Sequence, residues 1–264
     1  MKKFKKVVPA LCALLVSAVM LGSSTYAWFS MNTSVTAQGM EVSAKSDSQY
    51  FVVASGLTPE NKFSEATVDK VDAALTQKGI NDTNDVYPVS KVATATDIVS
   101  EQGEGKYTNG DTVTAGDWFT ASSPKRDKVK GDDTNDKLLK NARKIDFGAK
   151  DYFLQYTFYV GLEKNSSDFT GKIKINATSD NAAAKVACSI SLLALPGKTE
   201  TLNQTFESVT GTDVESTETY SLTKANLSVI KVVVYVYIDG EDNQIKSDGF
   251  TTLTGKVTLT VKAA

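Results

Sequence analysis

Residues 227–238 read LSVIKVVVYVYI, and this stretch decides the fold class. Apolar side chains recur at every second position and β-branched residues predominate, which is typical of a β-strand with one face in a hydrophobic core. The inward face is expected to carry Ile230, Val232, Val234, Val236 and Ile238, and the outward face Lys231, Val233, Tyr235 and Tyr237. The stretch therefore predicts a long, half-buried strand.

Other strands of this kind surround it in the last part of the chain. Long apolar or alternating runs occupy 152–162, 172–177, 185–195 and 255–261, with turn signals such as Pro196-Gly197 between them. Strands at this spacing, with few helical patterns between them, indicate an antiparallel β-sandwich or jelly roll. We therefore predict an all-β fold with residues 151–264 as the main body of the sandwich.

The N-terminal third adds further strands and an insertion. Alternating or apolar runs in 28–54, with a bend or bulge at Gly39, predict N-terminal strands of the same β domain. Residues 55–150 are rich in Asp, Asn, Thr, Gly and Lys and predict a polar, loop-rich insertion. Within this insertion, helical spacing of apolar residues predicts short helices over 68–78 and 136–144.

The first 27 residues have the pattern of a cleavable export signal. Four lysines within the first six residues precede an apolar run over 7–21, which is shorter than the roughly 20 residues needed to span a bilayer. Thr25-Tyr26-Ala27 supplies small residues for a cleavage site, so we expect signal peptidase to cut after Ala27 and leave Trp28 as the new N-terminus. The alternative is a retained N-terminal membrane anchor. Cleavage predicts a secreted or cell-surface protein without stable membrane insertion.

Composition excludes several classes of function. The chain has no histidine, which removes His-based catalytic triads and the usual zinc sites. Loss of residues 1–27 would leave Cys188 as the one cysteine, on the same strand face as Val186 and Ile190, where a buried small hydrophobe is expected. The remainder would be acidic, so no nucleic-acid partner is expected. We predict that the protein is not an enzyme and needs no cofactor.

One acidic segment offers a weak calcium site. Asp239, Glu241 and Asp242 cluster hard oxygen ligands after the strand over 227–238. Their spacing does not fit the calcium loop of EF-hands, and Asp239-Gly240 is also a strong hairpin-turn signal. The segment is therefore interpreted as either a turn or a calcium loop.

The junction at 24–30, STYAWFS, and the alternating segment at 35–44 resemble the TasA/camelysin group of exported Gram-positive proteins. That group has a T-[WY]-A-x-F junction at the end of its signal, followed by a small-residue-Gly turn and a strand. Residues 233–242 and the strand after Gly255 also resemble the closing strands of related clostridial secreted proteins. The resemblance covers about twenty residues at the start and roughly the last third of the chain.

The resemblance implies a jelly-roll matrix protein that forms extracellular biofilm fibres after processing by a dedicated signal peptidase. In such fibres the freed N-terminal segment of one subunit completes a sheet of the next. Here the donor segment would carry Trp28, Phe29, Met31 and Val35. Burial of its two aromatic side chains would supply roughly 3–6 kcal/mol. The alternative is that this segment folds back onto its own sheet. The protease activity attached to the camelysin name is not carried over, because the chain lacks histidine.

Two functional hypotheses follow. The first is a secreted, non-catalytic structural subunit that self-associates into extracellular fibres or a biofilm matrix by N-terminal strand donation. The second is a monomeric cell-surface adhesin, or a glycan- or protein-binding module, that uses the insertion at 55–150.

Overall fold

The computed structural model describes residues 35–46, 51–63, 68–69, 75–78, 85–121, 139, 141–163, 166–240 and 252–264. These residues divide into two compact units. The sandwich unit draws on Ser34–Pro88, Gly148–Asp239 and Thr251–Ala264, and the small unit is built mainly on Val89–Phe147. The polar region predicted at 55–150 therefore contributes to both units, because the described strands before Pro88 pair with the sandwich.

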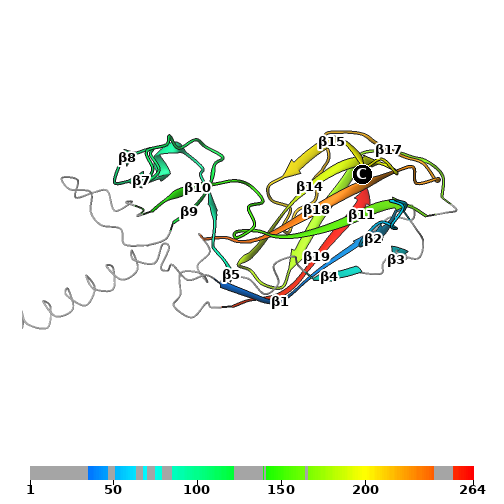
Figure 1. The fold of residues 1–264 in the computed structure, drawn as a ribbon, viewed down its shortest axis with the longest axis horizontal. Helices are drawn as coiled ribbons and strands as arrows, with labels where there is room; N and C mark the ends of the chain where they lie inside the picture. The colour runs from blue at the N-terminus through cyan, green and yellow to red at the C-terminus, as the bar shows by residue number, and fades with distance from the viewer. Residues whose placement is uncertain are drawn as a thin grey trace, which may run out of the picture. The chain divides into compact units, whose positions relative to one another are not determined.

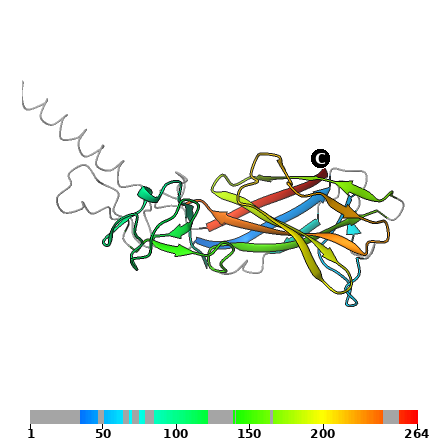
Figure 2. The same ribbon diagram turned by 90° about the horizontal axis from the view of Figure 1, so that it is seen from above.

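The sandwich unit consists of two six-stranded sheets, which Figures 1 and 2 show as two layers. The first sheet contains β16 (Val214–Glu215), β13 (Ile173–Ser179), β19 (Thr252–Ala263), β1 (Val35–Ser46) and β4 (Leu75–Lys78) in that order, and β5 (Asp85–Val86) also pairs with β1. The second sheet has the order β15 (Thr199–Phe206), β14 (Ala184–Ala194), β18 (Ser228–Ile238), β11 (Leu154–Leu162), β2 (Phe51–Ala54) and β3 (Val68–Asp69). A short ribbon of β12 (Phe169–Gly171) and β17 (Tyr220–Leu222) completes this unit.

The core of the sandwich follows from the alternation in the sequence. In β18 all five residues of the predicted inward face are fully buried. Tyr156 and Phe158 of β11 lie opposite Val234 and Val232 in the antiparallel ladder, so the two strands bury one continuous apolar surface. Cys188 is buried in β14 opposite Val234, as predicted, and its burial raises the pKa of its thiol. The prediction of an all-β sandwich is confirmed.

One strand pair departs from the antiparallel pattern. β1 and β19 run parallel, so the first described strand and the last strand of the chain lie side by side. The register shifts between Ala37 and Met40, where three steps along β1 match two along β19, from Leu253 to Gly255. This confirms the predicted bulge at Gly39. Gly255 has a φ of 142°, which an L side chain rarely adopts, so the irregular pairing requires glycine there.

Both predicted helices are wrong. Within 68–78 the described residues form the strands β3 and β4, which pair with β2 and β1. Within 136–144, Leu139 is not helical and the segment ends in β10 (Arg143–Ile145). The apolar spacing was a weak helical signal, and pairing with the edges of existing strands satisfies the same backbone groups.

The small unit has its own architecture. β6 (Ser90–Lys91), β9 (Trp118–Thr120) and β10 form a three-stranded sheet, and β7 (Val99–Ser100) pairs with β8 (Gly103–Glu104). A single turn of 3₁₀ helix, Ala95–Asp97, is the one helical element in the described part of this unit. Its core is a separate cluster of buried side chains: Val92, Ile98, Tyr107, Val113, Phe119, Ala121, Leu139 and Ala142.

Candidate assembly interface at the sheet edges

Most of the predicted N-terminal site falls outside the described residues: Ala27, Trp28, Phe29 and Met31. Val35 is the first residue of β1, where it pairs with Val86 of β5 in the same chain. Val35 is therefore already paired within its own chain. The seven residues 28–34 connect the predicted cleavage site to this interior strand.

Of the three candidate calcium ligands, only Asp239 is described. Its N–H donates a hydrogen bond of 3.2 Å to the carbonyl of Ala183, while Glu241 and Asp242 lie outside the described residues. Burial raises the pKa of Tyr237, and the charges of Asp239 and Glu207 act in the same direction. In the described part of the chain, no three acidic or cysteine side chains come close enough to hold a metal ion.

Because strand addition needs an open sheet edge, the edges of the sandwich are the candidate assembly sites. On the side formed by β13 and β15, residues 209–220 lie along β13 and form two hydrogen bonds to β15. We call this segment the edge clasp. On this side, β13 of the first sheet contacts β14 of the second sheet. On the opposite side, β1 of the first sheet contacts β2 of the second sheet. No pattern in the sequence marks the clasp, because this short stretch of mixed polarity has no clear period.

The clasp occupies the free edge of β13. Ala177 donates through its N–H to the carbonyl of Val209 and accepts through its carbonyl from the N–H of Gly211, both at 2.8 Å. Ile173 is held in the same way, because its N–H donates to Ser216 Oγ at 3.1 Å and its carbonyl accepts from the N–H of Ser216 at 2.8 Å. The backbone N–H and carbonyl groups at both positions are therefore already hydrogen-bonded to the clasp.

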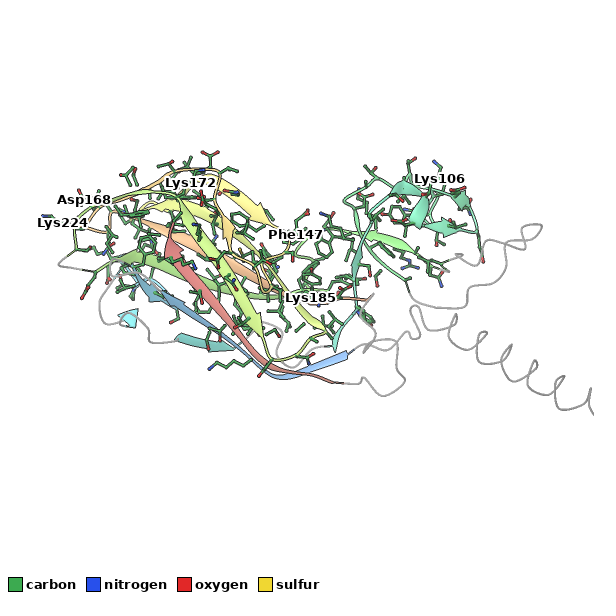
Figure 3. The ribbon with its side chains drawn as sticks, turned by 180° about the vertical axis from the view of Figure 1, so that it is seen from behind. Lys106, Phe147, Asp168, Lys172, Lys185 and Lys224 are labelled. Carbon is green, nitrogen blue, oxygen red and sulfur yellow. The ribbon has the colours of Figure 1, made fainter. Side chains whose placement is uncertain are left out.

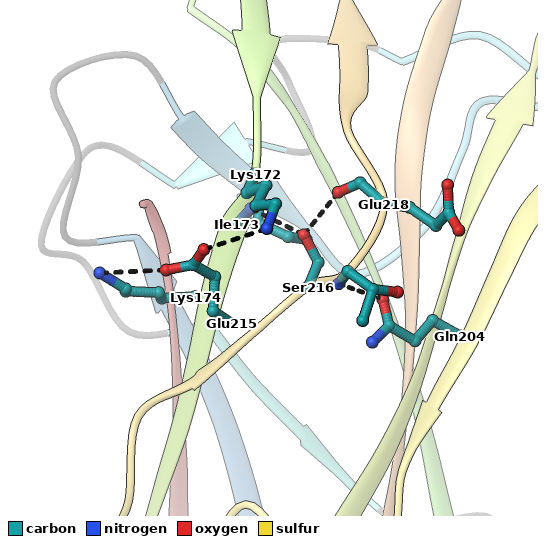
Figure 4. Close-up of polar contacts among 8 residues, drawn as sticks. Lys172, Ile173, Lys174, Gln204, Glu215, Ser216 and Glu218 are labelled. Carbon is teal, nitrogen blue, oxygen red and sulfur yellow. Dashed lines mark hydrogen bonds and ion pairs between the residues drawn. The ribbon is translucent and has the colours of Figure 1, made fainter.

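The same segment reaches across to the second sheet (Figure 4). Thr217 donates its N–H to Gln204 Oε1 of β15 at 3.0 Å, and Ser216 Oγ donates to the carbonyl of Glu218 at 2.8 Å. The Tyr220 hydroxyl donates to the carbonyl of Leu202, also in β15, at 2.9 Å. Burial raises the pKa of Tyr220 to about 12, so this donor stays protonated at neutral pH.

Charged side chains fasten the outer surface of the clasp. Glu215 pairs with Lys172 at 3.5 Å and Lys174 at 3.4 Å, and Asp213 pairs with Lys262 of β19 at 2.7 Å. The hydrogen bond from Lys262 lowers the pKa of the Asp213 carboxyl, and the amide of Asn176 acts in the same direction. These pairs are solvent-exposed, so they add orientation more than stability.

At the end of the sandwich near the β12–β17 ribbon, side chains form hydrogen bonds to the backbone. The N–H of Lys224 donates to Asp168 Oδ1 at 2.9 Å, and Figure 3 shows the two residues side by side at this end. Asn226 uses its side-chain amide to bond both the N–H and the carbonyl of Leu162, at 2.8 and 2.9 Å. It thereby replaces a strand partner at the end of β11.

The opposite side of the sandwich ends in much shorter strands. β4 has four residues, and β3 and β5 have two each. Among the described residues, no strand pairs beyond β4 or β3. β1, with twelve residues, is therefore only partly covered on this side by strands that the structure describes.

Tyr235 and Tyr237, which the sequence placed on the outer face of β18, are used for packing. Tyr237 is buried, and its ring lies 5.6 Å from that of Phe153. Tyr235 lies against Gly148, where an added Cβ would come within 2.8 Å of the tyrosine ring. Their position favours cross-strand packing over ligand binding.

Comparison with known proteins does not assign a family. No family model and no curated protein matches the chain. A solved structure titled "Structure of infectious bursal disease virus Gt strain" is similar over 83% of this chain and 67% of that chain, at 10% identity and a TM-score of 0.19. A likeness this low carries no argument about fold or function. Among the described residues, no helix is long and apolar enough to cross a membrane.

Proposed function

We propose that this chain is an exported, non-catalytic structural subunit that self-associates into extracellular fibres or a matrix by strand addition. The observation that carries the proposal is the asymmetry of the sandwich edges. On one side the clasp occupies the edge of β13, and on the other side β1 is covered by β4 and β5, which have four and two residues. Three of the predicted donor residues, Trp28, Phe29 and Met31, lie in 28–34, the seven residues directly before β1.

The export step supports this proposal from the sequence side. Cleavage after Ala27 would create a new N-terminus that begins Trp28-Phe29, two large apolar side chains at the start of a short segment. Such side chains gain most when a neighbouring groove takes them out of water. The resemblance to the TasA/camelysin group points to the same role.

The test is electron microscopy of the protein recovered after export, with its N-terminus determined by mass spectrometry. We expect an N-terminus at Trp28 and fibres that disappear when residues 28–34 are deleted. A matched control, Asn32→Ala/Thr33→Ala, keeps the aromatic side chains and should still form fibres. Monomers at high concentration with residues 28–34 present, or unchanged fibres without them, would contradict the proposal.

The small unit supports a second candidate, an adhesin or binding module. Its separate core shows that part of the predicted insertion has its own packed structure. A glycan array probed with the exported protein distinguishes the two functions. Binding of a defined glycan by a monomer would favour the adhesin.

A further inference from the structure

We propose that the edge clasp, residues 209–220, is a one-sided block to strand addition at the first sheet, so that a second copy of the chain adds to that sheet only at the side of β4 and β5. The direction of assembly in this statement rests on the proposed function. The block itself rests on the contacts of the clasp and can be tested separately.

The clasp uses the backbone groups that an added strand would need. At Ile173 and Ala177, both the N–H and the carbonyl already bond to the clasp. At Lys174 and Ile175, β13 pairs with Glu215 and Val214 of β16, which is part of the clasp. An incoming strand would have to displace all of these bonds before it gained any of its own.

Side chains hold the clasp in place from both sheets. Ser216 is 1% exposed, and its hydroxyl joins the edge of β13 to the carbonyl of Glu218. Gln204 and the carbonyl of Leu202 bind the clasp from β15. Because the clasp is also tied to β15, a strand that displaced it from β13 would have to break these contacts to the second sheet as well.

The opposite side lacks comparable protection among the described strands. Four residues of β4 and two of β5 cover β1, and two residues of β3 cover β2. A longer incoming strand would displace few hydrogen bonds there and form more in return. Short strands at one side and a tethered clasp at the other give the subunit a direction.

The test removes three side-chain tethers without changing charge, in the variant Gln204→Ala/Ser216→Ala/Tyr220→Phe. The control makes the same three chemical changes at positions with no clasp contact: Gln102→Ala/Ser189→Ala/Tyr159→Phe. Hydrogen exchange of the peptide around Ile173 and Ala177 reports whether the clasp has opened. The three substitutions remove four hydrogen bonds and should accelerate exchange there about 100-fold, and the control should leave it unchanged.

Contacts between copies are then located by cross-linking single added cysteines. The buried thiol of Cys188 is out of reach in the folded protein, so Thr212→Cys in the clasp or Tyr87→Cys beside β5 supplies the reactive group. With the clasp intact, assembled protein should cross-link through position 87 and not through position 212. The triple variant should also cross-link between copies through position 212.

The outcomes separate the two proposals. Cross-linking through position 212 with the clasp intact, or none in a folded triple variant with fast exchange, would overturn the block. If the wild type forms no fibres while the triple variant associates through position 212, the block stands and the fibre function fails. Should the triple variant fail to fold, Ser216→Ala alone removes the tether to Ile173 and is judged by the same two readouts.

Discussion

The sandwich unit is held by long strands whose inward faces are apolar at every second position, whereas the small unit is held by short strands, turns and the charged pair of Asp117 and Lys144. In β11 and β18, Phe158 and Val232 are fully buried opposite each other. In the small unit, Asp117 Oδ1 bonds Lys144 Nζ at 2.7 Å, and its Oδ2 accepts from Thr114 N–H at 3.0 Å and the Tyr107 hydroxyl at 3.2 Å.

This difference separates two ways of fixing a β structure. A long alternating strand has its register set by burial, because a one-residue slip would expose its whole apolar face. Strands of two or three residues cannot set their register in this way, so turn hydrogen bonds must do so. We therefore expect the carboxylate of Asp117 to contribute to the stability of the small unit, as large buried side chains do in the sandwich unit.

The largest effect is expected from Phe158→Ala. Truncation of this fully buried ring leaves a cavity between the sheets and should lower the free energy of unfolding by about 3–5 kcal/mol. Urea unfolding followed by far-ultraviolet circular dichroism measures the loss. Thr157→Ala, on the half-exposed face of the same strand, is the control and should change stability by less than about 1 kcal/mol. Equal effects of the two changes would refute the assigned strand faces.

The matching experiment on the small unit is Asp117→Ala. It leaves the Tyr107 hydroxyl, the N–H of Thr114 and the Lys144 ammonium without their shared acceptor, and should cost about 2–3 kcal/mol. Fluorescence of Trp118, which is buried in this unit, follows its unfolding, with Trp28→Phe as the background. The exposed Glu101→Ala is the control. If Asp117→Ala leaves the midpoint of the Trp118 unfolding transition unchanged, the carboxylate does not hold the unit together.

A smaller loss is expected at Gly161, where the sandwich has a close contact outside its core. An added Cβ would lie 2.6 Å from the ring of Phe63 and 2.9 Å from Oδ1 of Asn226. Gly161→Ala should therefore destabilise the sandwich by about 1–3 kcal/mol through overpacking. At Gly56 an added Cβ meets nothing within 4 Å, so Gly56→Ala is the control. Thermal unfolding of both variants decides whether the contact is as tight as the structure places it.

The two units also differ in how far sequence predicted them. The strands over 152–162 and 227–238 were predictable because burial on one face leaves a period of two in the residue order. The pair of Asp117 and Lys144 was not, because a contact across 27 positions leaves no local pattern. The clasp escaped prediction for the same reason, since its partners Ile173 and Gln204 lie on other strands. The parallel pairing of β1 with β19 joins the two ends of the described chain, and no local signal marks it.

Acid should weaken the small unit through the same carboxylate. Burial alone would raise the pKa of Asp117, but the bonds from Lys144 and Thr114 outweigh it and place the folded pKa below its ordinary value. A lowered folded pKa gives stability that is present above the unfolded pKa, near 3.9, and is lost as pH falls through the folded pKa. The Trp118 transition should therefore weaken below about pH 4. The effect should be smaller than that of truncation, because a protonated carboxyl still accepts hydrogen bonds.

The control for the acid experiment is Asp117→Asn, which cannot titrate. Its Trp118 transition should depend less on pH than that of the wild type over the same range. If the Trp118 transition depends equally on pH in the two proteins, the acid sensitivity comes from other carboxyl groups.

The smallest effect is expected from a charged pair of the sandwich, and it sharpens the contrast with Asp117. Lys231 Nζ lies 2.6 Å from Glu200 Oε1 on the outer face of the second sheet, and Glu200 Oε2 accepts from Ser191 at 3.1 Å. Both charges are partly exposed, so a double-mutant cycle of Glu200→Gln and Lys231→Met should give a coupling of only about 0.2–1 kcal/mol. Salt at about 1 M should remove most of it. The Asp117 carboxylate is less exposed and bonds three groups, so the loss of stability caused by Asp117→Ala should persist in salt. A Glu200–Lys231 coupling as large and as salt-resistant would mean that charged pairs support both units alike.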